Sequence, residues 1–94
     1  MSLAARIGDM HTCAMTTGTV PHVGGAILSG YTDVLIGGMC AARSGDEALC
    51  TGAVDTIAEG CDTVLIGGMP AARLGDLTSH GGVITEGYTD VLIG

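Results

Sequence analysis

The sequence predicts an all-β fold, and three observations carry this prediction. A motif that reads Thr-Asp-Val-Leu-Ile-Gly-Gly-Met-x-Ala-Ala-Arg-x-Gly-Asp occupies residues 32–46, and a close copy occupies residues 62–76. The apolar runs are short and rich in Val and Ile, and glycine pairs or Gly-Asp turns close them within a few residues. No segment carries apolar residues at helical spacing over three turns.

The repeated motif also predicts how the single domain is organised. The chain starts inside the motif, at residues 4–9, and ends inside it, at residues 89–94. A repeat of a few tens of residues is typical of stacked or rotationally repeated folds. Three near-copies around one axis predict a small cone with pseudo-threefold symmetry, and its two incomplete ends are expected to close the circle. The three units cover roughly residues 4–38, 39–68 and 69–94.

The strands are expected in the same order within each unit. Each unit has one strong Val-Leu-Ile signal and one shorter apolar run between glycines or turns. The strong signals lie at 34–36, 64–66 and 91–93, and the shorter ones at 26–28, 54–57 and 83–85. Arg6 and Arg43 are 37 residues apart, whereas Arg43 and Arg73 are 30 apart. The first unit is therefore expected to hold an insertion, at about residues 14–21.

Composition limits both stability and function. The 94 residues include 17 glycines and neither Phe nor Trp, so the core is expected to need a metal, disulfides or a partner surface. The net charge of −7, with three Arg and no Lys, argues against nucleic-acid binding and against adhesion to anionic membranes. The longest apolar stretch, at 34–42, is too short to span a bilayer, and the first residues lack a signal-peptide pattern. Reduced cysteines, which favour metal binding over disulfides, are therefore expected.

The histidines and two of the cysteines fall at related positions. Four residues after each Gly-Asp pair come Cys13, Cys50 and His80, which places three donors around one axis. His80 directly precedes a Gly-Gly pair, His22 is separated from one by Val23, and His11 lies two residues before Cys13. Thiolate and imidazole are the donors of structural zinc sites, which bind through four protein ligands. Spacing alone leaves open which four of these five residues bind the ion.

Met69-Pro70-Ala71-Ala72-Arg73 contains the Pro-Ala-Ala-Arg motif, and on this basis the chain resembles the PAAR-repeat proteins. The segments 8–13, 21–25, 50–52 and 78–82 resemble that family as well, so the resemblance covers almost the whole chain. It implies a cone of short strands that caps the trimeric valine-glycine-repeat spike of the bacterial type VI secretion system. The second copy departs from the motif, because Cys40 replaces its proline.

The resemblance also implies the metal and its ligands. Family members hold a structural zinc ion at the sharp end with three histidines and one cysteine, which favours zinc over iron. On that pattern the expected ligands are His11, His22, Cys50 and His80, with Cys13 as the reserve ligand. The protein would be made in the bacterial cytoplasm without a signal peptide. The secretion apparatus would then translocate it, together with toxin effectors, to pierce target membranes without anchoring there.

Two other functions compete with this one. A zinc hydrolase would keep an open metal position for water and a carboxylate base nearby, but the candidate carboxylates lie in turn motifs and no catalytic residue is assigned. A disulfide-stabilised extracellular binding module would show no free thiols. Metal analysis and thiol counting distinguish these alternatives.

The remaining candidates concern the broad end of the cone, where contact with a partner is expected. Candidate contact residues are Arg6, Arg43, Arg73, Ile36, Ile66 and Ile93. Each arginine precedes Gly-Asp by one residue, so the alternative is a local Arg–Asp bridge within a turn. Cys61 aligns with Tyr31 and Tyr88, and is interpreted as a small buried hydrophobic residue, as is Cys40.

Overall fold

The computed structural model describes the chain except for residues 1, 13–15, 18–19, 22–23, 51–52 and 94. All the regular elements that it describes are strands, so the all-β prediction is confirmed. They are β1 (Ser2–Ala4), β2 (Thr16–Thr17), β3 (Val20–Pro21), β4 (Gly24–Ile27), β5 (Tyr31–Ile36), β6 (Met39–Ala41), β7 (Glu47–Cys50), β8 (Ala53–Thr56), β9 (Cys61–Ile66), β10 (Met69–Ala71) and β11 (Tyr88–Ile93). Within these residues no helix is long and apolar enough to cross a membrane.

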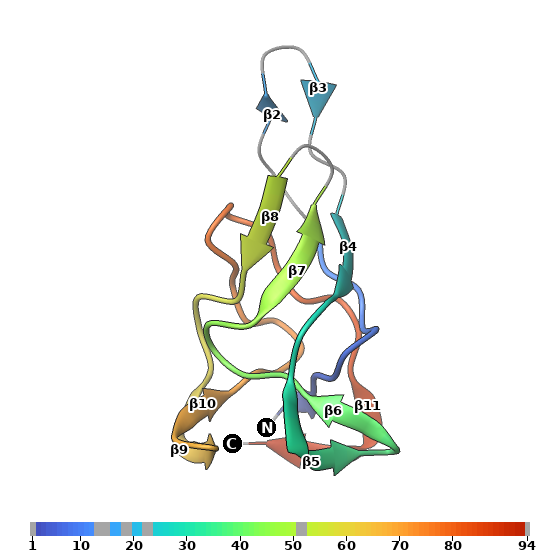
Figure 1. Ribbon diagram of the computed structural model, residues 1–94, viewed down its shortest axis with the longest axis vertical. Coiled ribbons are helices and arrows are strands. Elements are labelled where there is room, and N and C mark those ends of the chain that lie inside the picture. The colour runs from blue at the N-terminus through green and yellow to red at the C-terminus, as the bar shows by residue number, and fades with distance from the viewer. Residues whose placement is uncertain (1, 13–15, 18–19, 22–23, 51–52, 94) are drawn as a thin grey trace.

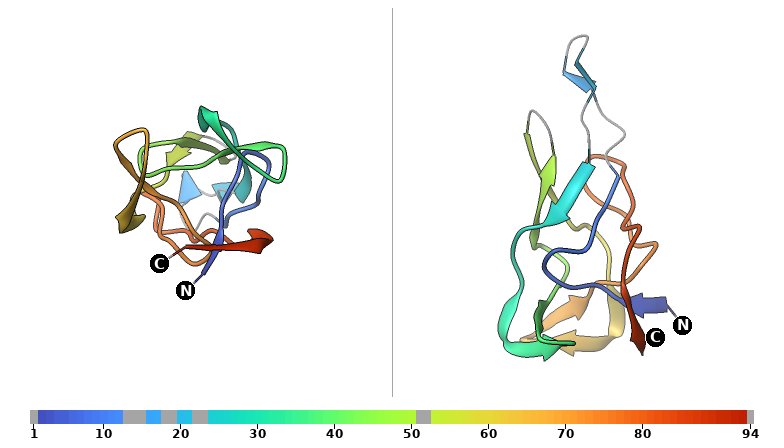
Figure 2. Two further views of the ribbon diagram at one scale, coloured as in Figure 1. Left: turned by 90° about the horizontal axis from the view of Figure 1, so that it is seen from below. Right: turned by 90° about the vertical axis from the view of Figure 1, so that its right-hand side faces the viewer.

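The molecule measures 38 × 23 × 22 Å, and three antiparallel hairpins form its broad end (Figure 1). They are β5–β6, β9–β10 and the pair made by the two ends of the chain, β11–β1. Ile36 pairs with Met39, Ile66 with Met69 and Ile93 with Ser2, and each hairpin has one register shift. Viewed from below, the three hairpins surround one axis (Figure 2). The predicted circular closure is therefore confirmed, because β1 completes the motif copy that β11 begins.

The second alanine of each motif copy joins the three units to one another. Ala42 donates its amide hydrogen to the Ala5 carbonyl at 3.0 Å, Ala72 donates to Ala42 at 3.0 Å, and Ala5 donates to Ala72 at 3.1 Å. These bonds form a closed ring that joins the three units. All three residues are at most 1% exposed. A larger side chain would have to displace neighbouring units, which explains why the motif has alanine there.

The hydrophobic core consists of two layers above the hairpins. The lower layer contains the first alanine of each motif copy and the last isoleucine of each base strand: Ala4, Ala41, Ala71, Ile36, Ile66 and Ile93, together with Cys61. The upper layer contains the second alanine of each copy and a second set of isoleucines: Ala5, Ala42, Ala72, Ile27, Ile57 and Ile84, together with Ala48. Successive residues of one strand face opposite sides, so one Ala-Ala pair contributes to both layers.

The narrow end is less symmetric. There β4, β7 and β8 form a three-stranded antiparallel sheet, and the β2–β3 hairpin, which belongs to the predicted insertion, lies at the far end (Figure 1). The strand predicted at residues 83–85 was wrong: Val83 and Ile84 make only isolated bridges, to Leu77 and His11. Ile84 lies only eight positions after Asp76, whereas Ile57 lies eleven positions after Asp46, so the third unit has too few residues for a full hairpin.

Candidate functional site

His11 lies inside the narrow end, where its side chain is fully buried. Its Nδ1 atom is 2.8 Å from the carbonyl oxygen of Gly25, and its Nε2 atom is 3.1 Å from Oδ2 of Asp55. A carbonyl oxygen and a carboxylate oxygen only accept hydrogen bonds. Both ring nitrogens therefore face oxygen acceptors of the protein.

Asp55 on β8 is the central polar residue of the narrow end, and it is not among the site residues predicted from the sequence. It is 0% exposed. Its Oδ1 atom accepts the backbone amides of Thr56 at 2.8 Å and of His80 at 3.0 Å. Burial alone would raise the pKa of Asp55, but hydrogen bonds from the Thr78 hydroxyl and from these two amides outweigh it and lower the pKa. Asp55 is thus held as a buried carboxylate.

A sequence signal for Asp55 did exist. The residue stands two positions before Ile57, and alternation along a strand puts both side chains on the inward face. The equivalent positions in the other units, two residues before Ile27 and Ile84, are glycines. A charge on an inward strand face needs a buried partner, and His11 is that partner here.

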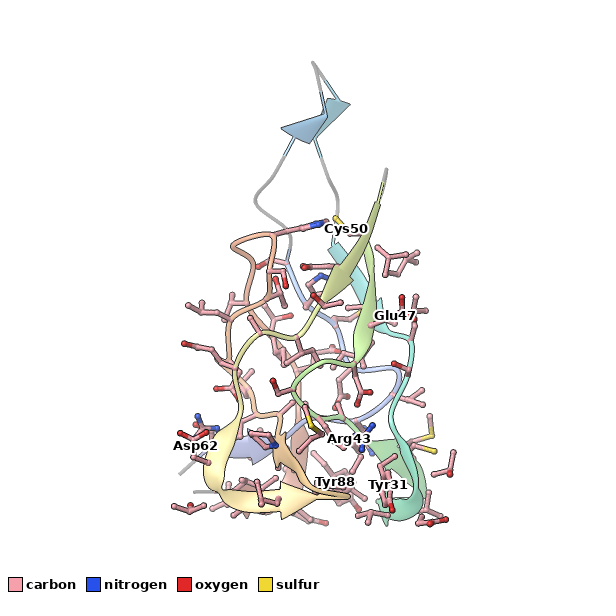
Figure 3. The ribbon with its side chains drawn as sticks, turned by 60° about the vertical axis from the view of Figure 1, so that its left-hand side comes forward. Tyr31, Arg43, Glu47, Cys50, Asp62 and Tyr88 are labelled. Atoms are coloured by element: carbon pink, nitrogen blue, oxygen red, sulfur yellow. The ribbon has the colours of Figure 1, made fainter. Side chains whose placement is uncertain are left out.

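His80 and Cys50 are the two predicted metal ligands that the structure describes at this end. The backbone of His80 is bonded to Asp55, and its Nδ1 atom is 3.9 Å from Oδ1 of the same carboxylate. Cys50 ends β7 and is 3% exposed, two residues beyond Ala48, which pairs with Asp55. Figure 3 shows Cys50 at the narrow end, away from Tyr31 and Tyr88. Both donors thus lie close to Asp55.

The other two metal candidates, His22 and the reserve ligand Cys13, lie outside the described residues. Within the described part of the chain, no three His, Cys, Asp or Glu side chains come together in a way that could hold a metal ion. The ligand set therefore stays a prediction. Cys40 and Cys61 carry free thiols, and Cys61 is buried in the lower core layer, as its alignment with the tyrosines predicted.

Each arginine of the motif forms a turn with the aspartate three residues later. The aspartate accepts the arginine's own backbone amide at 2.7–2.8 Å, and their charged groups approach to between 2.9 and 3.6 Å. The aspartates are at most 7% exposed. The local interpretation of the Arg-x-Gly-Asp motif is therefore confirmed: these arginines stabilise the turns that join the units.

Two of the arginines also stack on tyrosines of the base hairpins. Arg6 lies 4.7 Å from the ring centre of Tyr88, and Arg43 lies 4.9 Å from that of Tyr31. In the second unit the residue equivalent to Tyr31 is Cys61, which has no ring for Arg73 to stack on. A hydrogen bond with the Thr63 hydroxyl lowers the pKa of the Cys61 thiol. The positive charge of Arg73 lowers this pKa further, by a smaller amount.

A surface pocket of about 320 Å³ opens beside the β9–β10 hairpin. Its lining includes Arg73, Glu59 and Asp62. Arg73 is already bonded to Asp76, and Glu59 accepts the amide of Leu77 at 3.2 Å. Two of the three charged groups thus have intramolecular partners, so the pocket has little of the convergent polar chemistry of a substrate site.

The base strands expose leucines and not the isoleucines that were predicted as partner contacts. Ile36, Ile66 and Ile93 are 6–8% exposed and belong to the core, so they offer little surface to a partner. The leucines just before them, Leu35, Leu65 and Leu92, are 60%, 59% and 51% exposed. Alternation along the strand explains the difference, because only one of two neighbouring side chains can face the core.

Comparison with known proteins agrees with this architecture. A search of curated proteins finds no match. A family model described as the PAAR motif matches residues 17–86, which is most of the chain. The match includes the second and third copies of the repeated motif and the whole β4–β7–β8 sheet. The chain therefore belongs to the PAAR-motif family, a structural family of type VI secretion spike tips.

Proposed function

We propose that this protein is a zinc-stiffened tip that caps the trimeric valine-glycine-repeat spike of a type VI secretion apparatus. The observation that supports it best is the broad end, where three base strands carry equivalent exposed leucines. A partner with threefold symmetry presents the same surface three times, and one chain with three near-identical hairpins matches it. In this role the tip sharpens the spike for piercing membranes and travels with toxin effectors to the target cell.

Zinc supports the same role at the narrow end. Cys50 and His80 offer the thiolate and imidazole donors of a structural zinc site, and His22 with either His11 or Cys13 would complete four. Bound zinc would supply a cross-link between units and no chemistry of its own. The core contains small residues and few large ones, so such a cross-link matters for stability.

The docking surface is tested by mixing the protein with a trimeric spike protein and measuring the mass of the complex. We expect one tip per trimer, and Leu65→Asp should abolish the complex because it places a charge in the apolar contact. Leu49→Asp is the matched control, since Leu49 is 52% exposed but lies on β7, outside the base hairpins. The docking proposal fails if the wild-type tip forms no complex, or if both variants lose binding equally.

The zinc site is tested by metal analysis and chelator titration. We expect one zinc per chain, and chelation should lower the melting temperature and change the circular dichroism spectrum. Structural zinc contributes on the order of 10–16 kcal/mol of apparent free energy to folding in small domains. Cys50→Ser should remove the metal, whereas Cys40→Ser, a half-buried thiol on β6 among the base hairpins, should keep it. A chelator that leaves spectrum and melting temperature unchanged would contradict the proposal.

A further inference from the structure

We infer that His11 is not a metal ligand but one half of a buried His11–Asp55 clamp, which joins the three units beneath the metal site and positions His80. The metal part of this inference rests on the proposed zinc site. The clamp itself rests on contacts within the described residues.

Both ring nitrogens of His11 are already in contact with oxygen atoms of the protein. A histidine ligand binds the ion through one nitrogen and usually donates the hydrogen of the other to an oxygen nearby. Here the Gly25 carbonyl lies 2.8 Å from Nδ1 and the Asp55 carboxylate lies 3.1 Å from Nε2. Both nitrogens therefore lie within hydrogen-bonding distance of a protein oxygen, and neither is directed at an open ligand position.

The position of the ring is also fixed from several sides. The His11 amide donates to the Gly25 carbonyl at 2.9 Å, which is the same oxygen that faces its Nδ1 atom. A side chain on Gly24 would overlap the His11 carbonyl, so the two backbones are in close contact. His11 also bridges to Ile84. Turning the ring outward to reach a metal would break contacts with β4 and β8 together.

The clamp connects all three units of the cone. His11 comes from the first unit and Asp55 from the second, and Asp55 in turn accepts the His80 amide of the third unit at 3.0 Å. His11 occupies the position that is Ala48 in the second unit and Thr78 in the third. Thr78 also hydrogen-bonds to Asp55, so the carboxylate has partners from each unit. Together they form a buried polar layer above the two apolar layers.

This arrangement assigns different roles to neighbouring residues of the narrow end. Asp55 positions the backbone of His80, a proposed ligand, and acts as a positioning residue for the metal. With His11 engaged in the clamp, the fourth ligand place falls to Cys13, which lies outside the described residues. The repeat supports this choice, since Cys13, Cys50 and His80 hold equivalent positions in the three units.

Nitrogen NMR of the histidine rings in the zinc-loaded chain tests the clamp without any substitution. We expect a zinc-bound nitrogen in His80 and none in His11. A zinc-bound nitrogen in His11 would overturn the inference. If the chain binds no zinc, the proposed metal site fails, but the ring signals of His11 still show whether both nitrogens are hydrogen-bonded.

Cobalt substitution with variants gives an independent result. The thiolate-to-cobalt absorption of the wild-type chain should correspond to two thiolates, and Cys13→Ser should reduce it by about half. His11→Gln should keep both thiolates and the metal stoichiometry while lowering the melting temperature. Asp55→Asn should weaken zinc binding by about 10- to 100-fold, as for other residues that orient ligands, whereas the exposed Asp33→Asn should not. One thiolate in the wild type, or loss of metal from folded His11→Gln, would contradict the inference.

Discussion

Single glycines decide how the base hairpins close against neighbouring units. Gly67 and Gly68 form the turn between β9 and β10, with φ angles of +58° and +87°. Positive φ at both central residues is typical of the type I′ turn, which matches the twist of paired strands. A Cβ on Gly67 would lie 2.5 Å from Cε1 of Tyr31, whereas a Cβ on Gly68 would meet nothing within 4 Å. Two adjacent glycines thus serve different purposes.

Alanine substitution separates these two purposes. Gly68→Ala should cost only backbone strain, about 1–2 kcal/mol. Gly67→Ala should cost that strain and a further ~1–3 kcal/mol of overpacking, because the Tyr31 ring is held by Arg43 and cannot easily move away. Urea unfolding of the two variants measures the difference. Equal losses of unfolding free energy would show that the Tyr31 contact does not constrain the turn.

At the same scale, residue types in the sequence predicted the donors but not their environment. Repeat alignment placed Cys50 and His80 at one end, where the structure also has them near Asp55. It did not predict that His11 would be engaged at both nitrogens, since that depends on an aspartate from another unit. Which residues of different units come into contact is decided by the fold. The identity and spacing of the donor residues alone therefore do not predict it.

Strands were predictable where the motif repeats and unpredictable where the units differ. The Val-Leu-Ile signals became β5, β9 and β11, because their alternation buries Ile and exposes Leu in every unit. The strand β7 has no comparable apolar run, since Glu47 and Leu49 face solvent and only Ala48 and Cys50 are buried. Segment 83–85 looked like a strand yet has too short a connection to pair along its length. Connection length decided these elements more than local propensity did.

The whole molecule is a closed ring of three units in which one hairpin is built from the two chain ends. The ring of hydrogen bonds between Ala5, Ala42 and Ala72 links each unit to the next through the same kind of contact. Ile93 pairs with Ser2 as Ile36 pairs with Met39, and two residues, 94 and 1, separate Ile93 from Ser2 when the ends are joined. The same number, Gly37 and Gly38, separates Ile36 from Met39. The sequence predicted this closure because its incomplete motif copies complement each other.

A circular permutant tests whether this ring is independent of where the chain is cut. Joining residue 94 directly to residue 1, with Met1→Gly, would recreate the Gly-Gly turn, and new ends would be opened between Gly67 and Gly68. We expect this permutant to melt within a few degrees of the parent, because one two-residue turn is exchanged for another and the loop-closure entropy is nearly the same. The control opens the chain between Ser44 and Gly45. That cut disrupts the Arg43–Asp46 turn. It also disrupts the backbone hydrogen bonds that Ser44 donates to Pro70 and Gly45 donates to Ile57, so it should unfold the protein. If the first permutant unfolds as readily as the control, the stability of the fold depends on the covalent order of the units. The hairpin formed by the two chain ends would then not be equivalent to the other two.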